Sequence, residues 1–497
     1  MSSDQTHTIP GTSINTSASA STVASVAPAH LTADPSVKVF VNRTLNMRKI
    51  KFVGLDMDHT LVRYHSHAFE ELSHQTMCKK LVDQKHYPPV ILGLKFDMDL
   101  AIRGLVIDKK KGNLLKVSRH GAIRASYHGT KPIDFPLQQK LYKSTYIDLS
   151  DANSYIAIDT AFSLSVATLF AQLVDIKDSP AGVDMADYET MSLDVIEMLD
   201  LSHRDGSLKN EVARNLPKYI IKDPDVVRGI ERFKKHDKKF FIVTNSDFAY
   251  SKLLLDYAIN PFLKDHKDWT EVFDYVVTLA QKPRFFWDSL RFLKVDAKTG
   301  AMTNYDDKLK PGIYQGGGAA KFAKDLGVEG DDIVYIGDHI YGDILRLKKD
   351  CNWRTALVVE ELETEIENYK KAQPFSTEIG HLMDRKEPLE RQLVDLITKR
   401  IEASDESNEA RIQDLQNQIS EIDKVISANI KKQQGVFNPH WGEIMRAGNE
   451  ESYFATQVDR YACVYMPKLS DLLEYSPRTY FRAARRPLAH ELALGLD

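Results

Sequence analysis

Cysteine is scarce in this sequence of 497 residues, which contains only Cys78, Cys351 and Cys463. The three are far apart and form no Cys-x-x-Cys pair or Cys/His cluster, so a disulfide framework and a zinc site are both disfavoured. No stretch approaches the roughly 18 consecutive apolar residues of a membrane span, and no basic segment followed by an apolar run begins the chain. We therefore expect a cytoplasmic protein with reduced thiols and no membrane partner.

The chain also lacks an excess of charge of either sign. Lysine and arginine total 66 and aspartate and glutamate total 70, which gives a formal charge of -4. A net charge this small and negative does not attract nucleic acid, so a phosphate-bearing ligand must be bound by a local group of residues. The content of 43% hydrophobic and 27% charged residues is typical of a globular protein, and the length predicts more than one domain.

Residues 1–36 consist largely of Ser, Thr and Ala with scattered Pro. Such a composition buries too little apolar surface to offset the entropy of the chain. We expect a disordered leader here, and a docking or targeting tail is the alternative.

Short apolar runs separated by helix-length segments recur along the rest of the chain. They lie at residues 50–55, 240–243, 275–277, 333–336 and 356–359. Runs of this length predict buried parallel strands in a doubly wound, Rossmann-like α/β sheet. Because ligands bind beyond the carboxyl ends of such strands, the residues directly after each run are the candidates for chemistry.

The spacing of the runs predicts the domains. Between Asp58 and Thr244 the chain is far longer than one crossover connection requires. We predict a core formed by residues 37–62 and 220–375 and a cap domain formed by residues 63–219. A large cap excludes water and macromolecules, and therefore indicates a small-molecule substrate.

A helical hairpin is predicted at residues 376–435, where apolar residues recur at helical spacing on both sides of a polar connector. This hairpin could pack within the chain or against another subunit. Residues 436–497 mix aromatic and basic side chains, and we expect this extension to pack on the core or at a subunit interface.

Two Asp-x-Asp pairs occur close together in the sequence. Asp56 and Asp58 come directly after a predicted strand, whereas Asp97 and Asp99 have no turn-forming Thr or Gly behind them. We interpret the second pair as structural. In the first pair, one carboxylate can attack a phosphorus atom while the other transfers the proton. A turn stabilised by the two aspartates is the alternative interpretation.

Four motifs come after predicted strands in this order: Asp56-x-Asp58-x-Thr60, Thr244-Asn245-Ser246, Lys282, and Gly337-Asp338 with Asp343. Each motif alone is a weak signal, but the ordered set resembles the signature of the haloacid dehalogenase superfamily of phosphotransferases. Asp56 would attack the phosphoryl group and form an aspartyl-phosphate, which divides one difficult hydrolysis into two easier steps. Asp58 would protonate the leaving oxygen and then deprotonate water.

Carboxylates this close repel one another unless a cation is present. A site with oxygen ligands, few protein groups and a substrate phosphate suits Mg²⁺. The expected ligands are the side chains of Asp56 and Asp338 and the backbone carbonyl of Asp58. Asp343 would hold a water bound to the ion, and capping of a helix is its alternative role.

The remaining motif residues would bind the phosphate. Thr244 offers a hydroxyl and a backbone N–H, and Asn245 would help to orient it. Lys282 would neutralise charge on the phosphoryl oxygens, and a solvated loop lysine is the alternative. The glycines at 316–318 could seat an anion, but without Walker spacing a plain helix-entry loop is the better interpretation.

A closer similarity rests on residues 54–61, 103–108, 112–117, 206–209, 244–247, 335–344, 454–457 and 460–462. In these segments the chain resembles the cytosolic purine 5′-nucleotidases, which prefer IMP and GMP. The resemblance covers most of the chain after residue 36. It implies a Mg²⁺-dependent 5′-nucleotidase that hydrolyses purine nucleoside 5′-monophosphates through phospho-Asp56.

The same resemblance implies a substrate site in the cap. Phe162 would stack on the purine, and Asp200, His203 and Lys209 would bind base and phosphate. Stacking with a few polar contacts is also what purine selectivity requires. Taken without the family, Phe162 would be a core residue and His203 a surface histidine.

One position departs from the family. Animal members have an arginine that contacts the base where this chain has Ile196. Arg204 could supply the guanidinium instead, or the preference between GMP and IMP could differ.

The resemblance further implies a nucleoside triphosphate effector site at Asp159, Tyr341, Lys349 and Gln457. It also implies a homotetramer and transfer of phosphate to a nucleoside as well as to water. Two other functions remain open, namely a phosphatase for another small phosphate ester and an inactive scaffold that binds a partner through the hairpin. The scaffold predicts a broken catalytic position, and the motifs contain none.

Overall fold

The computed structural model describes residues 37–143, 147–149, 151–180, 184–403 and 407–495. It divides into two compact units, of which the larger spans Lys38–Ala484. The smaller unit contains helix α16 (Ala489–Leu494). The expected leader at residues 1–36 lies outside the described residues.

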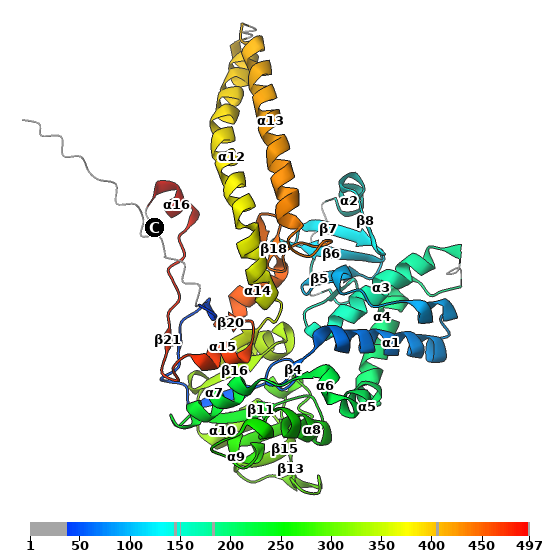
Figure 1. The fold of residues 1–497 in the computed structure, drawn as a ribbon, viewed down its shortest axis with the longest axis vertical. Helices are drawn as coiled ribbons and strands as arrows, with labels where there is room; N and C mark the ends of the chain where they lie inside the picture. The colour runs from blue at the N-terminus through cyan, green and yellow to red at the C-terminus, as the bar shows by residue number, and fades with distance from the viewer. Residues whose placement is uncertain (1–36, 144–146, 150, 181–183, 404–406, 496–497) are drawn as a thin grey trace, which may run out of the picture. The chain divides into compact units, whose positions relative to one another are not determined.

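A ten-stranded sheet forms the centre of the larger unit (Figure 1). Its strands lie in the order β1 (Phe40–Val41), β20 (Val464–Met466), β17 (Arg354–Val358), β16 (Ile333–Gly337), β3 (Phe52–Leu55), β11 (Lys239–Val243), β12 (Tyr275–Thr278), β15 (Gly312–Gly316), β13 (Phe292–Val295) and β14 (Met302–Tyr305). From β20 to β15 every neighbouring pair is parallel, and β1, β13 and β14 pair antiparallel at the two edges. The predicted α/β core with a parallel sheet is confirmed.

The five predicted runs form five adjacent strands, β17, β16, β3, β11 and β12. β3 lies in the middle of them. Leu55 at its end is paired with Ile336 of β16 on one side and with Ile242 of β11 on the other. The residues directly after these strands therefore meet at one edge of the sheet.

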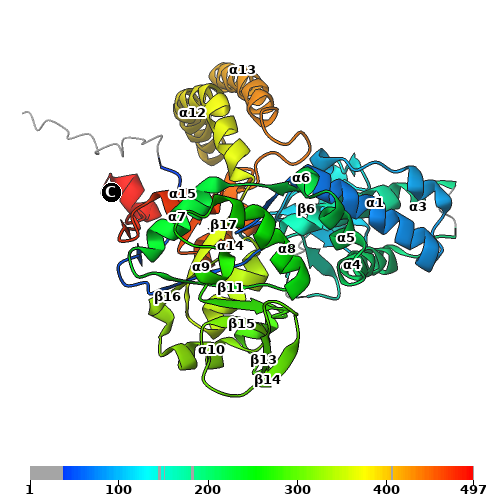
Figure 2. The same cartoon turned by 60° about the horizontal axis from the view of Figure 1, so that its bottom comes forward.

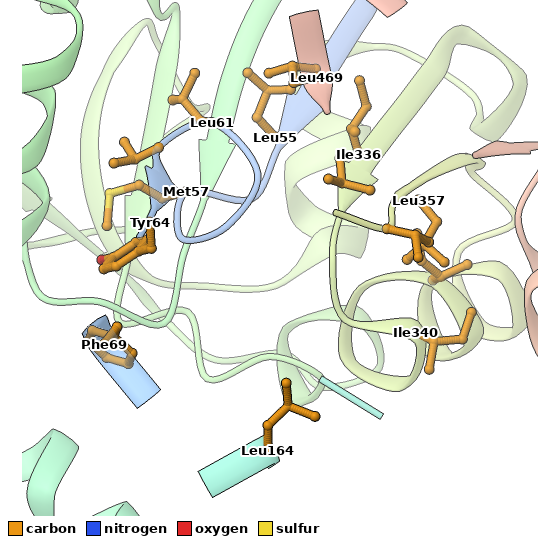
Figure 3. Packing of buried hydrophobic residues seen from close by; sticks show 14 of the residues in the cluster. Leu55, Met57, Leu61, Tyr64, Phe69, Leu164, Ile336, Ile340, Leu357 and Leu469 are labelled. Carbon is orange, nitrogen blue, oxygen red and sulfur yellow. The ribbon is translucent and has the colours of Figure 1, made fainter. Parts of the chain in front are cut away.

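Helices cover both faces of the sheet. Side chains alternate along each strand, so buried strands present apolar side chains on both faces. Leu55, Ile336 and Leu357 come from three adjacent strands and belong to one buried apolar cluster (Figure 3), whereas Phe241 and Tyr335 belong to another. α7 and α15 contribute to the first cluster and α10 to the second, on opposite sides of the sheet (Figure 2). The helices around the sheet are α7 (Pro224–Lys234), α8 (Phe248–Ala258), α9 (Trp269–Val272), α10 (Ala319–Leu326), α11 (Arg346–Asp350) and α15 (Leu469–Glu474).

A segment between β3 and β11, here called the insertion (residues 63–221), has secondary structure of its own. β4 (Arg63–Tyr64) and β10 (Ile220–Ile221) pair antiparallel where the insertion joins the core. Its helices are α1 (Ser66–Lys85), α2 (Phe135–Tyr142), α3 (Leu164–Lys177), α4 (Tyr188–Arg204), α5 (Ser207–Arg214) and α6 (Leu216–Tyr219). A separate antiparallel sheet runs in the order β8 (Lys131–Pro132), β7 (Ile123–His128), β6 (Asn113–Val117), β5 (Leu105–Asp108) and β9 (Tyr155–Ala157). The second Asp-x-Asp pair also lies here, where exposed Asp97 caps a short 3-10 helix by accepting from Asp99 N.

The helical hairpin consists of α12 (Leu362–Ala403) and α13 (Glu409–Gln434), which lie side by side (Figure 1). α12 begins well before residue 376, and Pro374 and Pro388 lie inside it. The first turn of α12 therefore stands next to β17, and the hairpin is continuous with the core. Within the described residues, no helix is long and apolar enough to cross a membrane.

The C-terminal extension contributes directly to the sheet. Its β20 pairs in parallel with β17, with Leu357 opposite Tyr465. The other elements here are β18 (Arg446–Ala447), β19 (Glu450–Glu451), α14 (Tyr453–Tyr461) and β21 (Tyr480–Phe481), and β21 pairs with β2 (Leu45–Asn46). A strand of three residues gives no pattern in the sequence, which is why the extension could not be placed from it.

We expect Glu70→Gln to stabilise the protein more at pH 8 than at pH 5. Glu70 in α1 is 1% exposed; one carboxylate oxygen accepts from Ser165 N at 2.6 Å and the other has no hydrogen-bond partner. Burial raises the pKa of Glu70 to about 7. Above its ordinary pKa the unfolded chain releases the proton that the folded chain keeps, so stability falls as the pH rises towards 7, by about 3 kcal/mol in all.

Urea unfolding of the wild type and of Glu70→Gln at the two pH values measures this difference. Glutamine can still accept from Ser165 N but has no charge to bury. The neighbouring Glu71 is only half-buried, and Glu71→Gln is the control for the same substitution at a more exposed position, where changes in stability are usually small. An equal effect of Glu70→Gln at both pH values would contradict the prediction.

Candidate active site

Three carboxylates meet beyond the ends of two adjacent strands. Asp56 follows β3 and Asp338 follows β16, while Asp343 lies in the π-helical turn η8 (Ile340–Leu345). Oxygen atoms of the three carboxylates all lie within 4.8 Å of one another. Gly337 permits this approach, because a Cβ at that position would lie 2.4 Å from Asp343 Oδ2. The parallel sheet thus places residues far apart in the sequence at one point.

Lys282 is bound between two of these carboxylates. Its Nζ lies 2.7 Å from Asp56 Oδ1 and 2.7 Å from Asp343 Oδ1, and it donates to Tyr335 Oη at 3.1 Å. The side chain is 5% exposed. Burial lowers the pKa of Lys282, but the charges of Asp343 and Asp56 outweigh it and raise the pKa well above its usual value. Lys282 therefore stays charged.

One lysine does not balance three carboxylates. Burial raises the pKa of Asp56 well above its usual value; Lys282 opposes this effect, and Asp343 and Asp338 reinforce it. Burial also raises the pKa of Asp338 to about 6, and its Oδ2 is buried without a hydrogen-bond partner. An excess of negative charge with an unpartnered carboxylate oxygen fits a hard divalent cation such as Mg²⁺.

Asp58 has a different environment from Asp56. Tyr64 Oη donates to Asp58 Oδ1 at 2.6 Å and Ser246 Oγ donates to Asp58 Oδ2 at 2.9 Å. Tyr64 Oη also lies 3.1 Å from Tyr250 Oη. The partners of Asp58 are neutral hydroxyls, whereas Asp56 contacts a lysine. This difference lets two nearby carboxylates take different parts in one reaction.

Thr244 and Asn245 follow β11 directly. Thr244 is fully buried, and its Oγ1 accepts from Ser246 N at 3.0 Å. Asn245 bonds in both directions to the backbone of Lys282, with Oδ1 accepting from N at 2.6 Å and Nδ2 donating to O at 3.0 Å. Asn245 therefore fixes the loop that carries Lys282, a contact that its predicted role did not include.

The carboxylates open into a cavity of about 830 Å³, a volume suited to a small ligand. The predicted catalytic, metal and substrate residues all line it: Asp56, Asp58, Phe162, Asp200, His203, Arg204, Lys209, Thr244, Asn245, Lys282, Asp338 and Asp343. The core supplies the residues of the four strand-end motifs, and the insertion supplies Phe162, Lys209 and the residues of α4.

Helix α4 forms part of that wall. Ile196, Asp200, His203 and Arg204 all line the cavity, because their spacing puts them on one face of the helix. Ile196 is half-buried, so an apolar side chain stands where the resembled family has an arginine. Burial lowers the pKa of His203 to about 4. The imidazole is therefore neutral at pH 7 and can both donate and accept a hydrogen bond.

Phe162 and Lys209 come from other elements of the insertion. Phe162 lies in the 3-10 helix η3 (Ala161–Ser163), and its half-buried ring stands edge-on to His203 with centroids 5.6 Å apart. Lys209 of α5 lies with Nζ 2.6 Å from Oδ2 of Asp247, the residue that caps α8. An ion pair thus joins the insertion to the core beside the cavity.

The residues expected at an effector site come from several segments of the chain. Asp159 lines the main cavity, whereas Tyr341, Lys349 and Gln457 do not. Tyr341 is 44% exposed, and Lys349 Nζ lies 5.8 Å from the ring centroid of Tyr461. Gln457 is half-buried on α14.

Several residues of the site were not predicted. Tyr64 and Tyr250 support Asp58, and Ser246 belongs to a predicted motif but had no role assigned to it. His59 is buried between the rings of Tyr64 and Phe162, with centroids 4.7 and 4.3 Å away. Ser246 could have been found from its place in the strand-end motif, but Tyr64 belongs to no motif in the sequence.

A parallel α/β sheet with this group of carboxylates and a lysine at its strand ends has the architecture of a phosphoric monoester hydrolase. Comparison with known families gives the narrower assignment. Residues 39–493 match the model of the 5′ nucleotidase family, so the chain belongs to that family. The predicted enzyme class and membership of the 5′-nucleotidases are thereby confirmed.

Individual relatives agree with this assignment. A 5′-nucleotidase domain-containing protein of Dictyostelium discoideum is 27% identical over 475 residues, which cover 93% of this chain and 76% of that protein. Human 5′-nucleotidase domain-containing protein 2 is 26% identical over 484 residues, which cover 92% and 86%. A solved haloacid dehalogenase-like family hydrolase from Xanthomonas campestris is 9% identical with a TM-score of 0.24, over 62% of this chain and 82% of that one. A likeness that low carries no argument.

Proposed function

We propose that the protein is a Mg²⁺-dependent 5′-nucleotidase that hydrolyses purine nucleoside 5′-monophosphates, GMP or IMP, to nucleoside and phosphate. The observation that carries the proposal is the position of Lys282, 2.7 Å from both Asp56 and Asp343, in a cavity that also includes Phe162. The cavity therefore contains charged groups that suit a phosphate and an aromatic ring that suits a base.

In this mechanism Asp56 attacks phosphorus, and the bond from phosphorus to the 5′ oxygen breaks as the aspartyl-phosphate forms. Asp58 gives its proton to the departing oxygen and then takes one from the water that attacks the intermediate, as the bond from phosphorus to Asp56 breaks and the carboxylate and phosphate are released. Tyr64 and Ser246 hold Asp58 in place. Asp56, Asp338 and the carbonyl of Asp58 would hold Mg²⁺, which neutralises phosphoryl charge when bound.

Two further residues, Lys282 and Thr244, act on the phosphoryl oxygens. Lys282 neutralises negative charge as it develops, and Asp343 holds the ammonium group in place. The backbone N–H of Thr244 already donates to Val277 O at 2.9 Å, so the expected N–H contact is replaced by the hydroxyl, which Thr244 offers to the phosphoryl group. Asn245 keeps the Lys282 loop beside it.

Selectivity for the base would come from the insertion. Phe162 stacks on the purine, and neutral His203 with Asp200 and Arg204 bonds to its edge. Ile196 offers the base an apolar contact only. We propose that Arg204 replaces the missing guanidinium, which an exposed position at the end of α4 allows.

A substrate panel tests the proposal. Phosphate release is measured for GMP, IMP, AMP, UMP and a sugar phosphate, with Mg²⁺ and with a chelator. We expect the highest kcat/KM for GMP or IMP. With the chelator we expect no phosphate release from any substrate. Equal rates for the sugar phosphate would favour the alternative of a phosphatase for another small ester.

We expect Phe162→Ala to raise KM for GMP by about 10-fold or more, because stacking of a base on an aromatic ring contributes about 1–3 kcal/mol. KM for glycerol phosphate, which has no ring to stack, should change far less. Steady-state kinetics with both substrates separates the two effects. Phe135→Ala replaces a phenylalanine that is 68% exposed and is the matched control. Equal changes for both substrates would mean that Phe162 only packs.

The finer properties implied by the resemblance are also proposed. The acceptor of the phosphate would be a nucleoside as well as water, a nucleoside triphosphate would act as effector, and the assembly would be a homotetramer. Adding nucleoside acceptors and triphosphates to the substrate panel, with light scattering for the mass, tests these three together.

A further inference from the structure

Arg103 connects the insertion to the candidate metal site. It lies just before β5 and is 1% exposed. Its Nη1 donates to the backbone carbonyl of Asp338 at 2.9 Å, and its Nε donates to Glu361 Oε1 at 2.9 Å. The guanidinium therefore joins three separate segments of the chain: the insertion, the loop after β16 and the residue that precedes α12.

The residues around Arg103 restrict both its side chain and its backbone. Its Cζ lies 5.7 Å from the ring centroid of Phe454 in α14. The next residue, Gly104, has φ +92°, and a Cβ there would lie 2.7 Å from Phe454 Cβ. The backbone N–H of Gly104 donates to Ile158 O at 2.6 Å. The backbone that carries Arg103 is thus fixed on both sides, so the guanidinium reaches Asp338 from a rigid base.

The contact with Asp338 matters because this residue is a candidate ligand of the ion. Its carbonyl is held by Arg103, while its own Oδ2 is buried without a partner. The loop behind it is closed by two bonds between His339 and Asp343, from His339 N to Asp343 Oδ2 at 3.3 Å and from Asp343 N to His339 O at 2.9 Å. Arg103 holds this loop from outside, and it comes from the insertion.

We propose that Arg103 is a positioning residue that holds the Asp338 loop in the geometry required to bind the metal ion, with Glu361 orienting the guanidinium. The inference rests on the proposed function, since it requires Asp338 to be a ligand of the ion. Arginine suits this role because its planar fork makes two bonds in fixed directions, which lysine cannot. A residue that supports a metal ligand typically changes metal affinity by about 10–100-fold when it is removed.

Arg103→Met and the milder Arg103→Lys test the proposal. Two readouts are used on the full chain: Mg²⁺ binding by isothermal titration calorimetry, and hydrogen exchange of the amides at residues 338–345 without metal. We expect the Kd for Mg²⁺ to rise by about 10-fold or more in Arg103→Met and by less in Arg103→Lys. Exchange at His339 and Asp343 should be faster in both. At saturating Mg²⁺, KM for GMP should stay near the wild-type value while kcat falls.

Arg63→Met is the matched control. Arg63 also belongs to the insertion and also binds a glutamate near the start of α12, with Nη2 3.0 Å from Glu363 Oε2, but its contacts do not reach Asp338. The Mg²⁺ affinity of Arg63→Met and its amide hydrogen exchange at residues 338–345 should match those of the wild type. If both Arg103 variants also match the wild type in both readouts, Arg103 has no positioning role and the inference is wrong.

The positioning role and the proposed function can fail separately. If the wild type binds no Mg²⁺, and Asp338→Asn behaves identically, the proposed function fails. Hydrogen exchange still tests whether Arg103 positions the Asp338 loop, because it measures the stability of that loop without metal or substrate. If Arg103→Met does not fold, Arg103→Lys keeps the positive charge beside Glu361 and decides the question alone.

Discussion

Replacing Asp56 with asparagine should lower kcat for GMP by about 10⁴-fold or more, the scale seen when a covalent nucleophile is removed from an enzyme. Asparagine has nearly the same shape as aspartate, and its oxygen can still accept the bond that Met57 N donates to Asp56 at 2.7 Å. It cannot form the acyl-phosphate bond. Phosphate release in the steady state measures the loss, and mass spectrometry of the quenched wild type seeks the phosphorylated Asp56 peptide.

The sequence itself offers the control for this experiment. Asp97 belongs to an Asp-x-Asp pair of the same form, but it is exposed and caps a short 3-10 helix. Asp97→Asn should leave kcat within about two-fold of the wild type, because exposed substitutions change little. Near-wild-type turnover in Asp56→Asn would exclude Asp56 as the nucleophile, whatever the behaviour of Asp97.

Lys282→Met should produce the largest combined loss of stability and activity. The ammonium group contacts two buried carboxylates at 2.7 Å, and removing it leaves both without their cation. Breaking a buried ion pair in this way costs about 3–5 kcal/mol. Turnover should also fall by about 10²–10³-fold, since one donor to the phosphoryl group is lost. Urea unfolding without metal and kcat at saturating Mg²⁺ give the two numbers.

Two comparisons make the Lys282 result specific. Lys321→Met removes a lysine that pairs with Asp325 at 2.6 Å near the surface, and such pairs contribute only about 0–1 kcal/mol. The double variant Lys282→Met, Asp343→Asn removes one of the stranded charges and should recover part of the stability. If the double variant is less stable than Lys282→Met, the unpaired charge of Asp343 is not the cause of the lost stability.

The sequence predicts the sheet and the residues at its strand ends for one physical reason. Buried parallel strands are apolar along their length, so β3, β11 and β16 are visible as runs. The topology alone then brings the residues at the carboxyl end of each run to one edge of the sheet. The placement of Asp56, Thr244 and Asp338 could therefore be anticipated without coordinates.

Other features have no such pattern. Strand β4, which contains Tyr64, has two residues and pairs with the distant β10, and β20 joins the sheet with three residues. Arg103 contacts residues more than two hundred positions away. The early start of α12 at Leu362 was hidden because Pro374 interrupts the helical pattern. Contacts of this kind arise from long-range packing, and one sequence carries no local record of them.

The pairing of β4 with β10 bears on how such a protein can change over evolutionary time. Tyr64 and Ile220 are partners across this short ladder, so the two crossings of the chain into the insertion lie about 5 Å apart. A module whose ends are neighbours can be enlarged, shortened or exchanged without altering the order of the strands beneath it. Substrate range can therefore diverge in the insertion while the phosphoryl chemistry is inherited unchanged with the sheet.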